Sequence, residues 1–385
     1  MTARILTTHA GSLPRPDALA ALLARKSRGE PYDAAGLDAA VEDATTAIVA
    51  RQVELDLDIV GNGEMGRESF FTYVRDRFRG FGGTGDTRPF DDLMEVPSLL
   101  ARKARLSESG DSVSLLAVPA AEGEVSWSGP EAIDRELDQL GRAASAAGAQ
   151  RCFVTAPSPG IVATAMTNRA YETLEEYVAA LVAGLTEEYR RIVDAGFVLQ
   201  IDAPDLAMDG AVAFGRKPRG EYLDFCRLVV AAINRAIAGL PSERVRLHVC
   251  WGNYDGPHVK DVPLEEILPI VTECRAGQLV LALANPRHAH ELKLLADGGL
   301  PPRFGLVAGV IETTHNYVEH PEVVADRILA AVEIVGDPRR VQAGTDCGFA
   351  TASGLGDVAP EVVWMKLASL AEGARRASER LYAPA

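Results

Sequence analysis

The chain has 385 residues, of which 47% are hydrophobic and 24% are charged. This is an ordinary globular composition, with enough apolar residues for one large core. The formal net charge of -15 argues against nucleic acid or an anionic membrane surface as a partner. The first residues lack the apolar segment of a signal peptide, and no apolar run reaches the roughly 20 residues of a membrane span. We therefore expect a cytoplasmic protein, and a homo-oligomer is compatible with the sequence.

The five cysteines are an odd number and lack the spacing of a disulfide framework. We expect reduced thiols, so the surroundings of each cysteine decide its role. Cys152 begins an apolar run, Cys226 lies on an apolar helical face and Cys274 lies near a helix end. We interpret these three as structural.

The N-terminal part begins with a β-prone run from Arg4 to Thr8, which the following Gly and Pro residues stop. Apolar residues at helical spacing predict helices from Asp17 to Arg28 and from Tyr32 to Leu55. A short apolar run from Asp58 to Val60 predicts the second strand.

The pattern loosens between residues 70 and 130. The glycine-rich residues 78–85 predict a flexible loop, and residues 113–127 predict paired strands. We interpret this part as a β-rich insertion after the second strand.

The rest of the chain alternates apolar strands with amphipathic helices. The predicted strands are Cys152 to Thr155, Phe197 to Asp202, Val245 to Cys250, Gln278 to Leu283, Phe304 to Ile311 and Val341 to Gly344. The predicted helices are Tyr171 to Ala195, Glu221 to Ala238, Leu264 to Ala276, His288 to Ala296, Pro321 to Val335 and Pro360 to Arg380. Eight strand-helix steps indicate an α/β protein, a (β/α)8 TIM barrel with residues 1–385 as one catalytic domain. An open doubly wound sheet is the alternative, but no Gly-x-Gly-x-x-Gly follows the first strand.

A candidate metal site lies at two of the predicted strand ends. His248 and Cys250 are two residues apart in one strand, so their side chains point to the same face. Cys347 follows a later strand, and the active site of a barrel lies at the C-terminal ends of its strands. The three side chains would form the soft N/S donor set that zinc prefers, with room for a further ligand. One strand-end cysteine alone would be interpreted as core packing; two, with a histidine beside one of them, favour a metal.

The other strand ends supply further polar candidates: His9, Ser12, Glu64, Asp202, Asn285, Glu312 and His315. Each also has a structural interpretation, because a carboxylate can cap a helix or begin a turn, and a serine can brace its loop. His315 can be a surface residue. His288 and His290 flank a helix start and are expected to face solvent, and His258 carries no signal.

Together these residues resemble the catalytic barrel of cobalamin-independent methionine synthase and its single-barrel relatives, which include epoxyalkane:coenzyme M transferase. The resemblance is specific because short matches occur jointly, in the family's order, over nearly the whole chain. The matching stretches are Thr8 to Pro16, Gly63-Glu64, Leu199 to Met208, His248-Val249-Cys250, Ala284 to His288, Gly309 to Glu312, Asn316 to Pro321 and Thr345 to Gly348.

The resemblance implies a zinc ion held by His248, Cys250 and Cys347. It also implies a pocket for an amino-acid thiol or other small thiol, lined by Ser12, Glu64 and Asp202, to which we add Asn285 as a substrate-binding candidate. The expected partners are thus a small thiol and an alkyl or methyl donor. If the donor is a methylated pterin, Trp251 is the aromatic side chain on which it would stack, and Arg15 is the positive charge that would bind it.

One departure from the family concerns the fourth zinc ligand. The family usually places a glutamate near the end of the sixth strand, where this chain has Ala282 or Leu283. There are smaller departures. Relatives tend to carry an acid at the position of Ala203 and an aspartate at the position of Glu312, and His315 is unusual for its position. Three protein ligands with an open position still describe a catalytic zinc site.

The leading hypothesis is zinc-dependent transfer of an alkyl group to a small thiol, and the first candidate for that group is methyl. His315 or His9 would supply the proton needed by the leaving group, and Glu312 is a further catalytic candidate. One alternative is the opening of an epoxide by a thiol of the coenzyme M type. Others are a metal-free lyase or decarboxylase on the same barrel, and a degenerate barrel that only binds a ligand.

Overall fold

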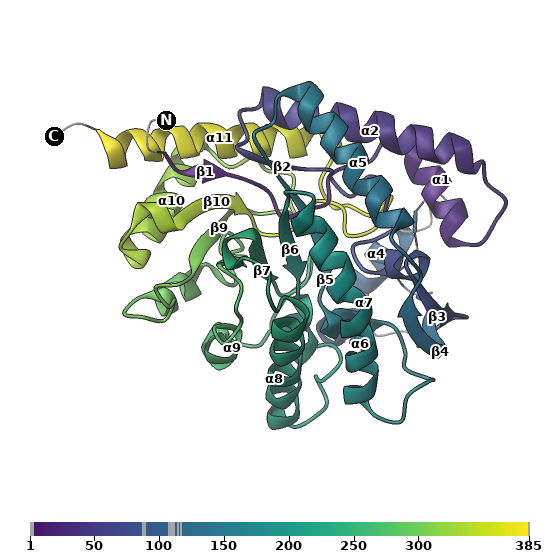
Figure 1. The fold of residues 1–385 in the computed structure, drawn as a ribbon. Coiled ribbons are helices and arrows are strands. Elements are labelled where there is room, and N and C mark those ends of the chain that lie inside the picture. Colours follow the sequence, from purple (N-terminus) through teal and green to yellow (C-terminus); the bar gives the residue numbers. More distant parts are fainter. Residues whose placement is uncertain (1–3, 87–89, 107–111, 114, 116–117, 384–385) are drawn as a thin grey trace.

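The computed structural model of the chain describes residues 4–86, 90–106, 112–113, 115 and 118–383. Its centre is a parallel sheet with the strand order β1-β10-β9-β8-β7-β6-β5-β2 (Figure 1). The strands are β1 (Leu6–Thr7), β2 (Ile59–Gly61), β5 (Arg151–Pro157), β6 (Val198–Asp202), β7 (Val245–Val249), β8 (Gln278–Leu281), β9 (Gly305–Ile311) and β10 (Val341–Thr345).

The two end strands of this sheet approach one another, so the sheet is a nearly closed barrel. The hydroxyl of Thr8, just after β1, donates to the carbonyl of Ile59 in β2 at 3.0 Å. All residues of β7 are buried, as expected for strands that are covered by side chains on both faces. The predicted (β/α)8 barrel is confirmed.

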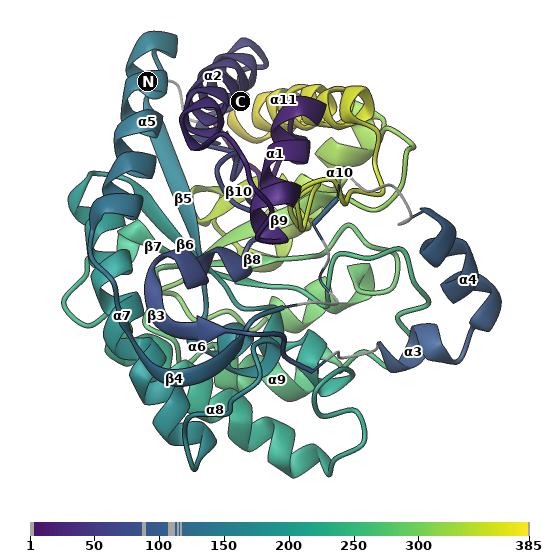
Figure 2. The ribbon, with the colours of Figure 1, turned by 90° about the vertical axis from the view of Figure 1, so that its right-hand side faces the viewer.

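Helices surround this sheet, as the end-on view of Figure 2 shows. They bury an apolar side against the strands and leave their charged side in water. The helices are α1 (Asp17–Ser27), α2 (Ala34–Glu54), α5 (Glu131–Ala147), α6 (Pro159–Ala165), α7 (Leu174–Asp194), α8 (Arg219–Ala236), α9 (Leu264–Val271), α10 (Pro321–Val335) and α11 (Pro360–Tyr382). The predicted helices agree with these bounds to within a few residues, with two exceptions. The helix predicted to run to Ala276 ends at Val271, and residues 289–295 form a 3-10 helix, η5.

The part between β2 and β5 contains a small antiparallel sheet of β3 (Phe78–Gly82) and β4 (Ala120–Trp127), with α3 (Asp91–Met94) and α4 (Pro97–Leu106) between them. The flexible loop predicted for residues 78–85 is therefore wrong for 78–82. Phe78 is buried and makes an edge contact with the ring of Trp127 at 5.5 Å. Gly80 has φ 92°, and a Cβ there would lie 2.5 Å from the carbonyl oxygen of Glu124, so these glycines permit close strand pairing. Of the strand pairs predicted for residues 113–127, positions 114, 116 and 117 lie outside the described residues.

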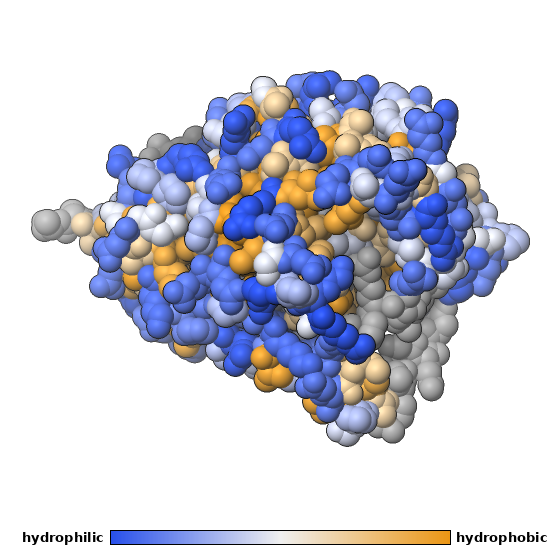
Figure 3. Space-filling model, turned by 90° about the horizontal axis from the view of Figure 1, so that it is seen from below, coloured by the Kyte–Doolittle hydropathy of each residue, from blue (hydrophilic) through white to orange (hydrophobic). Residues whose placement is uncertain are grey.

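One face of the molecule is predominantly polar (Figure 3). Hydrophilic residues cover much of the face in Figure 3, and hydrophobic residues gather near its middle. Across the part of the chain that the structure describes, no helix combines the length and apolar character needed to cross a bilayer.

Candidate metal centre and its pocket

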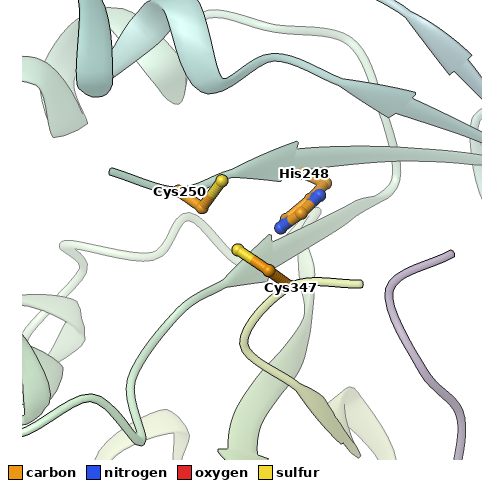
Figure 4. Close-up of side chains that lie close together, drawn as sticks. All are labelled: His248, Cys250 and Cys347. Carbon is orange, nitrogen blue, oxygen red and sulfur yellow. The ribbon is translucent and has the colours of Figure 1, made fainter. Parts of the chain in front are cut away.

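The three predicted metal ligands meet at one end of the barrel. His248 lies in β7, Cys250 follows that strand and Cys347 follows β10. One donor atom from each lies within 4.8 Å of the others, and all three residues are buried. Their side chains point toward one another (Figure 4). One imidazole nitrogen and two sulfurs at this spacing can hold a metal ion.

His248 is oriented by partners on both sides of its ring. Nδ1 lies 2.9 Å from Oδ1 of Asp202, which is opposite His248 in the register of β6 and β7. Nε2 lies 3.0 Å from the backbone carbonyl of Asp346. Asp202 also accepts a hydrogen bond from Gln200, at 3.0 Å. A carboxylate on one ring nitrogen is the usual second partner of a histidine that binds a metal through the other nitrogen. A metal on Nε2 of His248 would replace its contact with the Asp346 carbonyl.

The two sulfurs of the cluster act on one another's pKa in opposite directions. Hydrogen bonding from Cys347 lowers the pKa of Cys250 well below its ordinary value, against the effect of burial, and the charge of His248 adds to this. The same interaction raises the pKa of the Cys347 thiol. Cys250 is therefore prepared to bind a cation as a thiolate.

The end of β8 offers no acid to this cluster. Ala282 lines the pocket beside Cys250 and Cys347. The carboxylate of Asp346 accepts the backbone N–H groups of Leu283, Ala284 and Asn285 at 2.9, 2.8 and 2.7 Å. This clamp ties the chain after β8 to the loop that carries Cys347, and it occupies the Asp346 carboxylate.

Glu64 and Arg15 lie together in the loops after β2 and β1. Glu64 has φ 60°, an uncommon conformation for a residue with a side chain, directly after Gly63 at φ 61°. Its Oε1 accepts from the Thr155 hydroxyl at 2.9 Å, whereas nothing among the described residues donates to its buried Oε2. Burial, with the charge of Asp202, raises the pKa of Glu64 to about 6 against the opposing effect of Arg67 and Arg15.

Arg15 donates through Nη2 to the backbone carbonyls of Glu64 and Arg67 at 2.8 and 2.9 Å. Its buried Nε and Nη1 find no acceptor in the part of the chain that the structure describes. Ser12 accepts the N–H of Ala350 at 3.2 Å and packs against Gly348, where a Cβ would lie 2.2 Å from its hydroxyl oxygen. Ser12 thus holds the loop that carries Cys347.

His9 lies away from the pocket. Its Nδ1 accepts the N–H of Gly11 at 3.2 Å, so its Nε2 donates to Gln52 at 2.9 Å. Burial lowers the pKa of His9 to about 4. This neutral ring fixes the turn after β1, and the catalytic role predicted for His9 stays a prediction.

Glu312 is buried at the end of β9 and organises the loop that follows. Its carboxylate accepts the N–H groups of Thr314 and His315 at 2.6 and 3.0 Å. The His315 side chain is 52% exposed, with Nδ1 3.3 Å from Oε2 of Glu312. Glu312, Thr313 and Thr314 line the pocket, and His315 stands beyond them.

Other pocket residues carry roles that sequence patterns did not reveal. Asn253 donates to the carbonyl of Gly348 at 2.7 Å and accepts from the hydroxyl of Thr313 at 2.9 Å, so it joins the loops after β7, β9 and β10. The predicted Asn285 also lines the pocket. No periodic pattern marks Asn253, because its partners lie far away in the sequence.

Two further histidines line the same pocket, His258 and His288. Both are buried, so the solvent-facing position predicted for His288 is wrong. Each lies within hydrogen-bond distance of Asp261, at 2.8 Å. The sequence signal for this group of side chains is slight: an acid stands three residues after each histidine, Asp261 after His258 and Glu291 after His288.

The fold and this site define a class: a (β/α)8 barrel with a buried His/Cys/Cys cluster at the C-terminal ends of its strands. The chain is 24% identical over 377 residues to the methionine synthase of Saccharolobus solfataricus, covering 97% of this chain and 95% of the relative. It is 25% identical over 344 residues to the methionine synthase of Sulfolobus acidocaldarius, covering 89% and 85%. No protein-family model matches the chain.

Solved structures agree with the fold. A B12-independent methionine synthase from Shewanella sp. W3-18-1, in complex with selenomethionine, superposes with a TM-score of 0.73 at 21% identity, covering 99% of this chain and 100% of that one. A putative vitamin-B12-independent methionine synthase from Listeria monocytogenes gives 0.65 at 19% identity, with 98% of each chain covered.

The resemblance to the cobalamin-independent methionine synthase family is thereby confirmed: the chain is a homologue of methionine synthases over most of its length. The prediction of an enzyme, a transferase related to these synthases, is confirmed with it.

Proposed function

We propose that this protein transfers an alkyl group, a methyl group in first place, to the sulfur of a small thiol bound beside a zinc ion. His248, Cys250 and Cys347 would hold the zinc. The observation that carries the proposal is the convergence of these three buried donor atoms within 4.8 Å of one another. Two sulfurs and one imidazole nitrogen are a donor set that zinc prefers over the harder magnesium or calcium ions.

Zinc in such a site supplies Lewis acidity, which lowers the pKa of a coordinated thiol so that it reacts as a thiolate. The chain itself prepares the site. Asp202 holds Nδ1 of His248 at 2.9 Å and keeps the ring aligned. Asp346 and Ser12 hold the loop that carries Cys347. The protein offers three ligands, because Ala282 stands where an acid would supply a fourth.

Two buried charged groups in the loops after β1 and β2 favour an amino-acid thiol as the acceptor. Glu64 Oε2 lacks a donor, and Arg15 Nε and Nη1 lack acceptors, among the residues that the structure describes. Buried charged groups are normally paired, so a ligand with both an ammonium and a carboxylate would satisfy both. The related Shewanella protein was solved in complex with selenomethionine, which is an amino acid of this kind.

In the reaction the substrate sulfur attacks the alkyl carbon, the bond between that carbon and its donor atom breaks, and the donor atom takes up a proton. His315 is the group we assign to proton delivery, held by Glu312 at the rim of the pocket. An epoxide donor would need the same proton on its ring oxygen, so opening of an epoxide by a thiol of the coenzyme M type stays as the alternative. We further propose that residues 1–385 form one catalytic domain, with residues 70–130 as its insertion, and that it works in the cytoplasm.

The test is X-ray absorption at the zinc edge, with metal analysis, on the full chain with and without homocysteine or coenzyme M. We expect bound zinc to gain sulfur neighbours with one of these thiols, and that thiol identifies the acceptor class. Cys347→Ser should lose one zinc per chain. Cys152→Ser is the matched control, because Cys152 is also buried yet lies outside the cluster; this variant should keep its zinc.

Zinc whose surroundings ignore both thiols, or a Cys347→Ser protein with undiminished zinc, would contradict the proposal. Either result would favour a barrel that only binds a ligand, and the absence of bound zinc from the wild type would favour the metal-free lyase.

A further inference from the structure

The His258, Asp261 and His288 side chains form a second group of donors. Nδ1 of His258 and Nε2 of His288 both lie 2.8 Å from the same oxygen, Oδ2 of Asp261. The three donor atoms lie within 4.8 Å of one another. Their side chains are only 5%, 3% and 5% exposed. Two imidazole nitrogens and a carboxylate oxygen are thus gathered at one buried point.

The outer nitrogens of both rings are held by acceptors. Nε2 of His258 faces the carbonyl of Tyr254 at 3.0 Å, and a carbonyl can only accept. Nδ1 of His288 faces the carboxylate of Glu291 at 2.9 Å. A neutral ring that donates through its outer nitrogen carries its lone pair on the inner one. Both lone pairs would therefore point at Asp261, the arrangement in which second partners orient histidines that bind a metal.

The backbone holds these groups in place. His258 has φ 54°, a left-handed conformation that is uncommon for a residue with a side chain. Asp92 from α3 accepts both the N–H of His258, at 3.0 Å, and the hydroxyl of Tyr254, at 2.9 Å. The ring of His288 stacks on Trp251 at 3.7 Å. Strain that is held by several independent contacts is typical of functional sites.

The charges of the side chains around this point also fit a divalent cation. Two carboxylates, Asp261 and Glu291, lie against the two rings with their side chains only 3% and 5% exposed, and a divalent ion would balance two buried negative charges. Ligands about 2.0–2.1 Å from a tetrahedral zinc ion lie about 3.4 Å apart, so each 2.8 Å contact would widen by about half an ångström.

We propose that His258, Asp261 and His288 bind a second divalent transition-metal ion. The harder N/N/O donor set separates it chemically from the S/S/N cluster of His248, Cys250 and Cys347. His258 and His288 line the same pocket as Cys250 and Cys347. The second ion would therefore adjoin the space where the substrates meet.

The experiment loads the purified full chain with Zn²⁺ or Co²⁺, removes weakly held metal on a desalting column, and measures metal per chain. Asp261→Asn and His288→Gln should each hold one ion fewer than the wild type, with the thiolate-to-cobalt absorption of the other site unchanged. The matched control is His290→Gln, since His290 is the exposed histidine two residues away; it should load like the wild type.

A Cys250→Ser/Cys347→Ser double variant isolates the proposed site. It should retain one Co²⁺ per chain without thiolate-to-cobalt absorption, and circular dichroism should show the native helix content. The proposal is overturned if this folded double variant retains no metal, or if Asp261→Asn and His288→Gln load as much as the wild type. Either outcome would mean that hydrogen bonds, without a metal ion, hold His258, Asp261 and His288 together. A wild-type protein that binds no metal at His248, Cys250 and Cys347 would instead count against the proposed alkyl transfer. That result would leave the proposal for His258, Asp261 and His288 unaffected.

Discussion

His248 and Asp202 lie opposite one another in the register of β7 and β6, and Nδ1 of the histidine is 2.9 Å from Oδ1 of the aspartate. The pair places a carboxylate behind the only nitrogen donor of the sulfur cluster. Asp202 was predicted to bind substrate. Its contacts with His248 and Gln200 favour a positioning role, in which the aspartate acts on the metal through the histidine.

We expect Asp202→Asn to weaken zinc binding by about 10- to 100-fold, because a neutral amide neither orients nor polarises the imidazole as a carboxylate does. Competition against a chromophoric chelator would measure the dissociation constant. Asp194→Asn, at the exposed end of α7, is the control for loss of one negative charge. Equal zinc affinity in the two variants would contradict a positioning role for Asp202.

Glu64 should make stability depend on pH. Burial raises its pKa from 4.5 to about 6 in the folded chain, so the folded state binds this proton more tightly than the unfolded state. Its contribution is present below pH 4.5 and is lost as pH rises through the folded-state pKa of about 6. A shift of this size corresponds to about 2 kcal/mol.

The side chain introduced by Glu64→Gln cannot ionise, so this variant should not lose stability as the pH rises through about 6. The free energy of unfolding of the variant, relative to the wild type, should therefore rise by about 2 kcal/mol between pH 4.5 and pH 7. Denaturant titrations of both proteins at several pH values would measure the difference. A difference that stays constant over this range would show that the Glu64 carboxyl ionises alike in both states.

Asp346 should matter for stability as well as for the site. In Asp346→Ala the buried N–H groups of residues 283–285 lose their acceptor. Each unsatisfied group costs about 1–3 kcal/mol, so we expect a loss of at least about 3 kcal/mol. Asp346→Asn keeps one carbonyl oxygen and should lose less. Unfolding of metal-free protein in guanidinium would measure this without a contribution from bound metal, and equal stabilities for the two variants would refute the clamp.

The proton donor can be identified by comparing two histidines. His315→Asn should lower kcat by about 10²-fold or more at unchanged KM if His315 delivers the proton. His9 has its pKa lowered to about 4 and uses both ring nitrogens within the barrel, so His9→Asn should leave the shape of the pH-rate profile unchanged. His290→Asn serves as an exposed control. A His315→Asn enzyme with normal kcat would remove His315 from the mechanism.

The regular part of the fold could be predicted from the sequence. Apolar runs of strand length alternate with helical periodicity from residue 151 onward, and this local pattern predicts the strands, most of the helices and the parallel sheet. Phe78–Gly82 was missed as a strand because its glycines indicate a loop. Only packing of Phe78 and Gly80 against β4 makes it extended.

The sulfur cluster could also be predicted from the sequence, because His248 and Cys250 are two residues apart at a strand end and Cys347 follows another strand of the same sheet. The partner of His248, the clamp of Asp346 and the His258, Asp261 and His288 cluster were decided by the tertiary structure. Sequence periodicity records which face of an element a side chain occupies. Contacts between loops depend on how the barrel brings their ends together, and no local pattern carries that information.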